Sequence, residues 1–424
     1  MNQPRVIPSI LEQHCEEASF LATLRTSYLA RADVSLDDLD DLDERIEAHL
    51  DGIRTTQQRG WLACREALGN AGSGEIFTAV TLALEANTAE RLSPLLAVVE
   101  AEPSLWSGLV GAFNWASPQD LKGTVKALLG SDSPFHCLVG LSSCLEHRVD
   151  PGPLLGAWCR SADPRLSMVA LRAVGELGVV SLRARCEELL HAPQDHRTFW
   201  AARSAVLTGD RMHAVDLLAQ MGLNTSLPLN MRRQAIEIAL QAMDLSKGHA
   251  LLRRMHDECV DQRLIIQSVG ILGCPRYAGW LIERMNDACL ARVAGEAFEL
   301  VTGADTRAMQ LPRDDRPIAD DCVGDASADV EVAMREDASL PWLDPAKIAA
   351  WWDSQGSRLS DQGRYLRGEV PTVERCFAIL KIGSQRHRRI AAQVLCLLQP
   401  GSVLFNTSAP AWRQRRLLEA ASPR

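Results

Sequence analysis

The stretch SADPRLSMVALRAVGELG, residues 161–178, decides how this chain folds. Asp163 and Pro164 form a helix-start signal, because an Asp side chain caps free backbone N–H groups and a Pro at the first helical position has no N–H to leave unpaired. Gly178 permits the turn that follows the helix. One helical face is apolar and contains small residues that let a neighbouring helix approach closely: Leu166, Val169, Ala170, Ala173, Val174 and Leu177.

Segments of the same design recur at intervals of roughly 30 residues. Each begins with a polar or Pro-containing turn, continues as an apolar-periodic helix and turns into a second helix. A two-helix unit cannot bury its apolar face alone, whereas stacking on its neighbours buries it. The sequence therefore predicts an all-α fold, an α-solenoid of antiparallel helix pairs. The predicted units start near Gly72, Ala101, Ser131, Ser161, Ala192, Asn224, Val260 and Ala288.

The composition of the 424 residues agrees with this fold and limits the function. Helix-forming Ala, Leu, Arg and Glu dominate, and only 5% of the residues are aromatic. The net charge of −9 argues against a general nucleic-acid binder. The chain has no apolar run of membrane-spanning length, and its start, MNQPRVIPSILEQHCEE, lacks the pattern of a secretory signal. The 12 cysteines are scattered without a C-x-x-C pair, so we expect reduced thiols and a cytoplasmic protein.

Four regions follow from these patterns. Residues 1–71 are expected to form an N-terminal helical cap, in which the acidic stretch DVSLDDLDDLDERIE (33–47) opens a solvated helix that runs to about Leu68. Residues 72–302 form the repeat array. Residues 303–341, rich in Pro, Gly and acidic side chains, form a loop or linker. Residues 342–424 form a C-terminal helical region with a basic tail, which could attract the acidic loop.

Catalytic patterns are missing from the sequence. The pairs Cys144/His147 and His256/Cys259 have ligand spacing on a helix, but no second ligand pair follows either one. There is no G-x-S-x-G elbow, and Gly72-Ser73-Gly74 lacks the Lys-Ser/Thr of a phosphate-binding loop. The acidic stretches supply solvated carboxylates and not a buried acid–base pair. We therefore expect no catalytic, cofactor-binding or metal-binding residues, and a chain that is not an enzyme.

The remaining candidate residues are aromatic and basic side chains of the C-terminal region, the types that dominate protein interfaces. Two alternative roles and one undetermined property remain beside this interpretation. The tryptophans could simply close the end of the solenoid, the basic cluster could serve nucleic acid, and nothing in the sequence determines the oligomeric state. The candidate protein-binding residues are Trp351, Trp352, Arg386, Arg388, Arg389, Trp412, Arg413, Arg415 and Arg416.

Residues 161–190 resemble a HEAT repeat, since Asp163-Pro164, Arg165, the run Ala170 to Ala173 and Leu177-Gly178 match the loose pattern of that superfamily. Residues 199–220 resemble it more weakly. The resemblance implies a solenoid and is nearly silent about function, because the HEAT pattern is degenerate. It plausibly extends over 72–302.

A second resemblance lies in the C-terminal region. The segments GRYLRG (363–368), GSQRHRRIAA (383–392) and QPGSVLFNTSAPAWRQ (399–414), with LVTGADTRAMQL (300–311), resemble an uncharacterised proteobacterial family of HEAT-like proteins. Genes of that family are found near type VI secretion components. The resemblance implies a non-catalytic adaptor or chaperone whose partner is a secretion spike, tip or effector protein. The alternatives are a HEAT-like nucleic-acid-binding or DNA-repair protein and, less favoured, a phycobilisome-type lyase.

Overall fold

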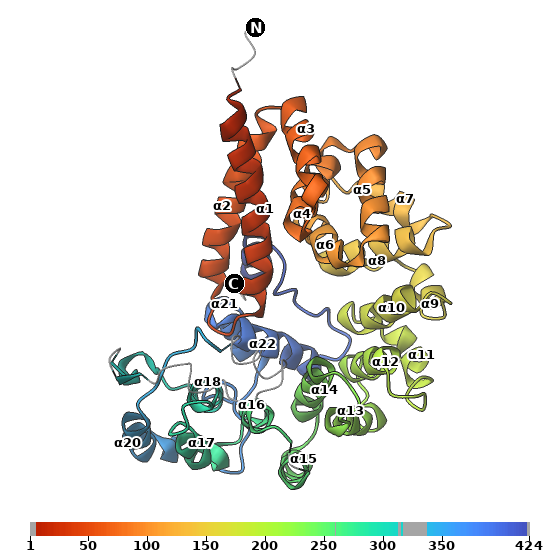
Figure 1. Cartoon of the computed structure of the whole chain (residues 1–424). Coiled ribbons are helices and arrows are strands. Elements are labelled where there is room, and N and C mark those ends of the chain that lie inside the picture. Colours follow the sequence, from red (N-terminus) through yellow and green to blue (C-terminus); the bar gives the residue numbers. More distant parts are fainter. Residues whose placement is uncertain (1–5, 259, 313–314, 317–336, 422–424) are drawn as a thin grey trace. The chain divides into compact units, whose positions relative to one another are not determined.

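The computed structural model describes residues 6–258, 260–312, 315–316 and 337–421. Helices account for the regular structure of this part of the chain (Figure 1), in which the only β-pairing is two isolated bridges, and the all-α prediction is confirmed. The chain divides into two compact units within the predicted repeat array. Unit 1 contains Met1–Ala30, Val34–Ala170 and Asn406–Arg424, and unit 2 contains Arg31–Asp33 and Leu171–Phe405.

Unit 1 is built from stacked helices. Helices α4, α6 and α8 form its inner row, in which each helix packs against the next. Helices α5 and α7 lie outside this row, and α1 packs on both α2 and α4. The helices of unit 1 are α1 (Pro8–Ala30), α2 (Leu36–Arg54), α3 (Gln58–Ala67), α4 (Ser73–Ala86), α5 (Ala89–Ala101), α6 (Trp106–Trp115), α7 (Thr124–Leu129), α8 (Pro134–His147), α9 (Leu154–Trp158) and α23 (Ala411–Ala420).

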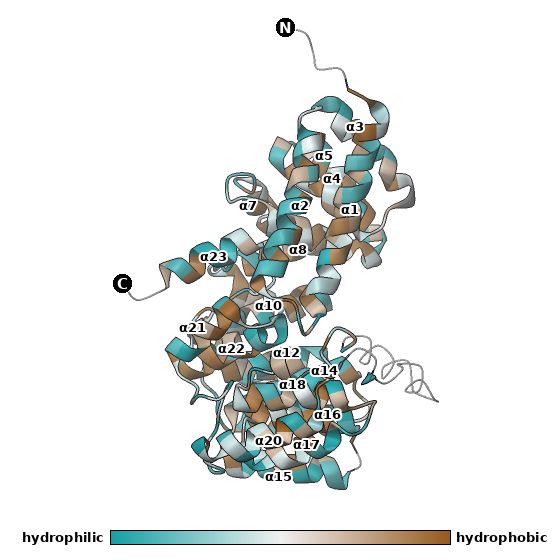
Figure 2. Cartoon of the chain, turned by 90° about the vertical axis from the view of Figure 1, so that its left-hand side faces the viewer, coloured by the Kyte–Doolittle hydropathy of each residue, from teal (hydrophilic) through white to brown (hydrophobic). Residues whose placement is uncertain are grey.

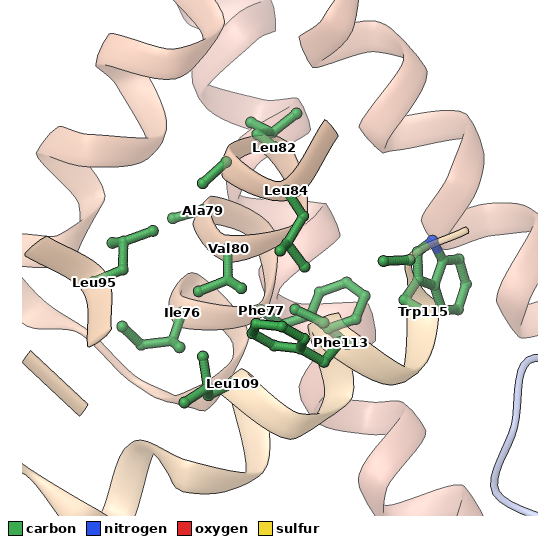
Figure 3. Close-up of a cluster of buried hydrophobic side chains, with 14 of the residues drawn as sticks. Ile76, Phe77, Ala79, Val80, Leu82, Leu84, Leu95, Leu109, Phe113 and Trp115 are labelled. Carbon is green, nitrogen blue, oxygen red and sulfur yellow. The ribbon is translucent and has the colours of Figure 1, made fainter. Parts of the chain in front are cut away.

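The core of unit 1 shows why this row forms. Ile76 and Phe77 of α4 face Leu109 and Phe113 of α6, and all four side chains are buried (Figure 3). Leu95 of α5 packs on the other side of α4. Burial of each such side chain contributes about 1.5–3 kcal/mol, and no single helix pair supplies enough partners alone.

The N-terminal helices differ from the prediction in one respect. The expected single helix from the acidic stretch to Leu68 is wrong, because α2 ends at Arg54 and α3 begins at Gln58. Gln57 has a left-handed φ of 53°, and the hydroxyl of Thr56 donates to the carbonyl oxygen of Ile53 (2.7 Å), so polar side chains replace the helical pattern there. The start of α2 is capped as expected, by reciprocal hydrogen bonds between Ser35 and Asp38.

Unit 2 repeats the same arrangement. Helices α12, α14, α16 and α18 form its inner row, and α13, α15 and α17 pack outside it. Figure 2 shows apolar residues distributed along these helices beside hydrophilic ones, as stacking requires. The helices are α10 (Pro164–Glu176), which spans the division between the units, α11 (Arg183–Glu187), α12 (His196–Leu207), α13 (His213–Leu223), α14 (Leu229–Ala242), α15 (Leu245–Asp257), α16 (Gln262–Leu272), α17 (Ala278–Arg284), α18 (Ala291–Thr302), α20 (Pro345–Gln355), α21 (Val373–Ile382) and α22 (Gln385–Leu398).

Helix α10 is the segment from which the fold was inferred. Asp163 Oδ1 accepts a hydrogen bond from the N–H of Leu166 (2.9 Å), so the predicted cap is present. Ala170 and Ala173 are completely buried. An inner-row helix, or α10 itself, begins a few residues after each of the eight predicted unit starts. The positions of Asp, Ser, Pro and Gly in the sequence therefore predict where the repeats begin.

Most of the predicted acidic loop 303–341 lies outside the described residues. Its first described residues pair in unit 2 with the segment that directly follows the loop: the N–H of Leu311 donates to Trp342 O (2.8 Å), and the N–H of Asp344 donates to Met309 O (2.8 Å). None of the described helices is long and apolar enough to cross a membrane.

The C-terminal region of unit 2 caps the inner row. The last carbonyl groups of a helix have no partner within that helix and must find one elsewhere. Residues 364–368 and 399–405, here called the capping segments, supply donors at the ends of five helices. The bonds are Arg364 side chain to Gln241 O and Met243 O at α14 (2.8 Å each), Tyr365 N to Gly273 O at α16 (2.8 Å), Arg367 N to Leu300 O at α18 (2.6 Å), Gly401 N to Leu207 O at α12 (3.3 Å) and Leu404 N to Glu176 O at α10 (2.9 Å).

Unit 1 uses the residues that follow in the same way. Asn406 donates from Nδ2 to Glu146 O at the end of α8 (2.8 Å), and the Arg413 guanidinium donates to Asn114 O at the end of α6. Arg25 and Asp43 form a buried ion pair (2.6 Å) that also holds the chain around Ala411, since Asp43 Oδ2 accepts from the Ala411 N–H (2.8 Å). Asp43 is therefore not part of a solvated face, although it belongs to the acidic stretch 33–47.

Candidate functional site

The arginines of the predicted 386–389 cluster have very different surroundings. Arg388 is completely buried and donates to Leu380 O (2.8 Å) and Gln385 Oε1 (2.8 Å), so it joins α21 to α22. Arg386 is largely covered and forms ion pairs with Glu296 and with Asp337 (3.3 Å). Arg389 is exposed, and no ion pair connects it to the described part of the chain. One helix turn thus carries one accessible arginine and two that hold the fold.

Asp337 is the point at which the acidic loop meets the basic end. Its carboxylate is buried and lies between Arg263 of α16 and Arg386 of α22. The expected attraction between the acidic loop and the basic C-terminal region is confirmed for this residue. His387, the chain neighbour of Arg386, is buried, and neither ring nitrogen has a hydrogen-bond partner among the described residues. Burial lowers the pKa of His387 to about 3.

The predicted tryptophans and the arginines of the tail pack against their own units. Trp351 and Trp352 lie edge-on to Phe298 of α18, with ring centroids 5.9 and 6.0 Å away. In unit 1, Trp412 lies edge-on to Trp115 at 4.6 Å and remains 43% exposed. Arg413 caps α6 as described above. Arg415 pairs with Asp37 (2.6 Å) and Asp40 (2.9 Å), and Arg416 is exposed.

The nine predicted residues are divided between the two units. Trp351, Trp352 and the three arginines of α22 belong to unit 2, whereas the residues from Trp412 to Arg416 belong to unit 1. Binding of a partner through them stays a prediction, for which Arg389, Arg416 and Trp412 are the most accessible side chains.

A different site emerges in unit 2, next to α22. A pocket of about 290 Å³ opens between the C-terminal half of α22, the ends of α14 and α16, and residues 364–371. We call it the α22 pocket. Its walls are aliphatic side chains, among them Ile271, Ile390, Val394 and Leu397, and its polar groups are Arg211, Gln241 and Arg364. A mostly apolar pocket with a few polar groups is the usual form of a binding site.

Both arginines of the α22 pocket lack a carboxylate partner among the described residues. Arg364 caps α14, and Arg211 donates to Val206 O, Asp210 O and Leu397 O (2.5, 3.0 and 2.9 Å). Burial lowers the pKa of each guanidinium below its ordinary value, and nearby acidic residues oppose this only through space. Two positive charges therefore meet at one pocket, stabilised chiefly by the carbonyl ends of helices.

Gln241 completes the site. Only 8% of its surface is exposed, yet neither its Oε1 nor its Nε2 has a hydrogen-bond partner in the part of the chain that the structure describes. A buried amide without partners costs about 1–3 kcal/mol, so native structures rarely keep one without a use. Leu398, an exposed apolar side chain, lines the pocket, and exposed Met212 and Val370 are the chain neighbours of the lining residues Arg211 and Pro371.

None of these three polar residues is predictable from a motif. Arg211 and Gln241 look like ordinary members of amphipathic segments, and their spacing in the chain carries no known motif. Arg364 stands in the segment GRYLRG, which carries a family resemblance but suggests no physical role for this side chain. The signal in the sequence is a short non-helical segment with two arginines between Gly363 and Gly368, which follows helices that need C-terminal caps.

No group of three or more His, Cys, Asp or Glu side chains within the described ranges is arranged to hold a metal ion. Comparison with known proteins adds no relative: no family model, no curated protein and no solved structure matches this chain.

Proposed function

We propose that this chain is a non-catalytic scaffold that binds another protein, and that the α22 pocket is the binding surface. The observation that carries the proposal is the α22 pocket itself, where aliphatic walls and exposed Leu398 surround two arginines that have no carboxylate partner among the described residues. Exposed Met212 and Val370 adjoin pocket residues in the chain. Apolar side chains around a few buried polar groups are what a partner segment can cover with a gain in free energy.

The way in which the inner row is capped supports this location. In unit 2 the face of α12 and α14 is covered by α22, and the ends of the inner row are occupied by the capping segments. A partner therefore does not have the whole inner face of stacked helices at its disposal, as it would in an open solenoid. The α22 pocket is a place on that side of unit 2 where apolar walls and unpaired polar groups remain.

The finer proposal follows the resemblance of the C-terminal segments to HEAT-like proteins encoded beside type VI secretion components. We propose a cytoplasmic adaptor or chaperone whose partner is a spike, tip or effector protein. The residues that carry the resemblance, such as Arg364 and Asn406, act as helix caps in this chain, so they support a common architecture more directly than a common partner.

Photo-crosslinking tests the proposal. A benzophenone amino acid is placed at Val370 or Met212, with Val149, an exposed apolar residue of unit 1, as the matched control position. In cells of the source organism we expect a protein adduct from Val370 and Met212 and none from Val149. An adduct with a secretion spike, tip or effector supports the finer proposal, and an adduct with another protein refutes it while supporting the scaffold. The absence of any position-specific adduct contradicts both.

A further inference from the structure

The unpaired groups of the α22 pocket specify what it can bind. Arg211 retains its Nε–H and one terminal N–H, and Arg364 retains its Nε–H and one hydrogen on each terminal nitrogen, after the backbone bonds described above. The nearest acidic side chains are committed elsewhere. Asp210 accepts from the N–H of Met212 (2.7 Å), and Asp244 accepts from the N–H of Lys247 (2.8 Å). The pocket therefore offers donors to an anion, and none of its described lining residues is acidic.

The planar guanidinium groups favour a planar anion. A carboxylate accepts two parallel N–H bonds from an arginine, and such charge-assisted bonds are stronger than those between neutral groups. Partial burial excludes competing water and screening ions. A carboxylate is therefore the group that best matches Arg211 and Arg364 together.

Gln241 adds a requirement that a simple carboxylate ion does not meet. Its Nε2 and Oε1 are now inaccessible to solvent and have no partner within the described residues, so a ligand reaches them when the amide turns towards the pocket; Nε2 can then donate to a carboxylate, and Oε1 needs a donor from the ligand. The last residue of a polypeptide carries such a donor, the backbone N–H, next to its carboxylate. It also carries a side chain, and an aliphatic one suits the walls formed by Ile271, Val394 and Leu397.

We propose that the α22 pocket binds the C-terminal carboxylate of a protein partner whose last residue is aliphatic. This inference rests on the proposed scaffold function and names the chemistry of the partner. Arg211 and Arg364 bind the carboxylate, Gln241 binds the adjacent N–H, and the aliphatic walls receive the terminal side chain. Exposed Met212, Val370 and Leu398 then cover the residues that precede the terminus.

Synthetic peptides test this proposal on the full chain. The probe is fluorescein-labelled Gly-Ser-Gly-Ser-Leu as the free acid, and fluorescence anisotropy measures its binding. Its C-terminal amide lacks only the carboxylate, and the amide of Gly-Ser-Asp-Leu-Ser carries an internal carboxylate. We expect saturable binding of the free acid and at least tenfold weaker binding of both amides. No binding of the free acid at millimolar protein concentration, or equal binding of either amide, overturns the proposal.

Two variants connect the binding to the pocket. Gln241→Met keeps the size of the side chain and removes both amide groups, and Arg364→Gln removes one of the two cations. Each variant is expected to bind the free-acid peptide at least tenfold more weakly. Gln119→Met, at an exposed site in unit 1, is expected to leave this binding unchanged. Since Arg364 also caps α14, Gln241→Met is the decisive variant, and unchanged binding in it refutes the assignment. If the free-acid peptide does not bind while the benzophenone at position 370 still crosslinks to a protein, the proposed scaffold function is retained and only the proposed C-terminal ligand is refuted.

Discussion

Replacing Gly178 by alanine tests the link between the repeats and the capping segment that follows α22. Gly178 has a φ of +68°, which costs an alanine about 1–2 kcal/mol. Its added Cβ would also lie much closer to Gly401 O than the 3.0 Å that real Cβ atoms keep, so the segment around Gly401 must move. That movement is expected to break up to two backbone hydrogen bonds, from Gly401 N to Leu207 O and from Leu404 N to Glu176 O. Each contributes about 0.5–1.5 kcal/mol to stability. The expected loss is therefore about 2–5 kcal/mol.

Urea denaturation followed by far-UV circular dichroism measures this loss. Gly152→Ala is the matched control, because Gly152 also has a left-handed φ, of +73°, but a Cβ there meets nothing within 4 Å. The control isolates the conformational cost of about 1–2 kcal/mol. Gly178→Ala should lower the free energy of unfolding by clearly more than Gly152→Ala does. Equal losses in the two variants would refute the close approach of the capping segment.

Three further predictions concern single side chains of unit 2. Arg388→Met should lower the free energy of unfolding by about 3 kcal/mol, because it removes the buried guanidinium's hydrogen bonds to Leu380 O and Gln385 Oε1, whereas Arg389→Met should change it by less than about 0.5 kcal/mol; equal effects in urea titrations would contradict the assigned burial. Gln241→Met should raise the unfolding temperature, since it removes an unpaired buried amide that costs about 1–3 kcal/mol, and a lowered temperature would show that the amide has partners. His387, whose pKa lies at about 3 instead of 6.5, stays neutral when the unfolded chain takes up a proton, so the free energy of unfolding should fall as the pH drops from 6.5 towards 3, by about 3 kcal/mol at about pH 4.5. His387→Leu should remove this part of the acid sensitivity, and an unchanged difference between titrations at neutral and acid pH would show that other groups cause it.

Local rules allowed much of the helical framework to be predicted. Asp163, Ser133 and Thr372 each accept a backbone N–H at the start of a helix, as their residue types indicate. The break at Gln57 escaped prediction, because Gln is not a residue type that marks a left-handed turn. The polar run from Arg54 to Arg59 is the signal in the sequence that the apolar pattern is interrupted there.

The capping segments and the α22 pocket depend on contacts between distant parts of the chain. The bond from Leu404 N to Glu176 O joins two backbone groups, so no side chain in the sequence reveals it. The cluster around Arg388 looked uniformly basic, yet successive positions of an α-helix point about 100° apart, so Arg388 is buried while Arg389 is exposed. Gln241 is conspicuous only once its missing hydrogen-bond partners are known.

Hydrogen exchange of the unmodified full chain, read by mass spectrometry, tests most directly that the capping segments are bound to the helix ends. Peptides that cover 363–369 and 399–405 should exchange on the order of a thousandfold more slowly than an unstructured chain, as hydrogen-bonded backbone does. The amides of Tyr365, Arg367 and Leu404 donate to the ends of α16, α18 and α10 and should be among the slow ones. Exchange of these peptides at the rate of an unstructured chain would contradict the account.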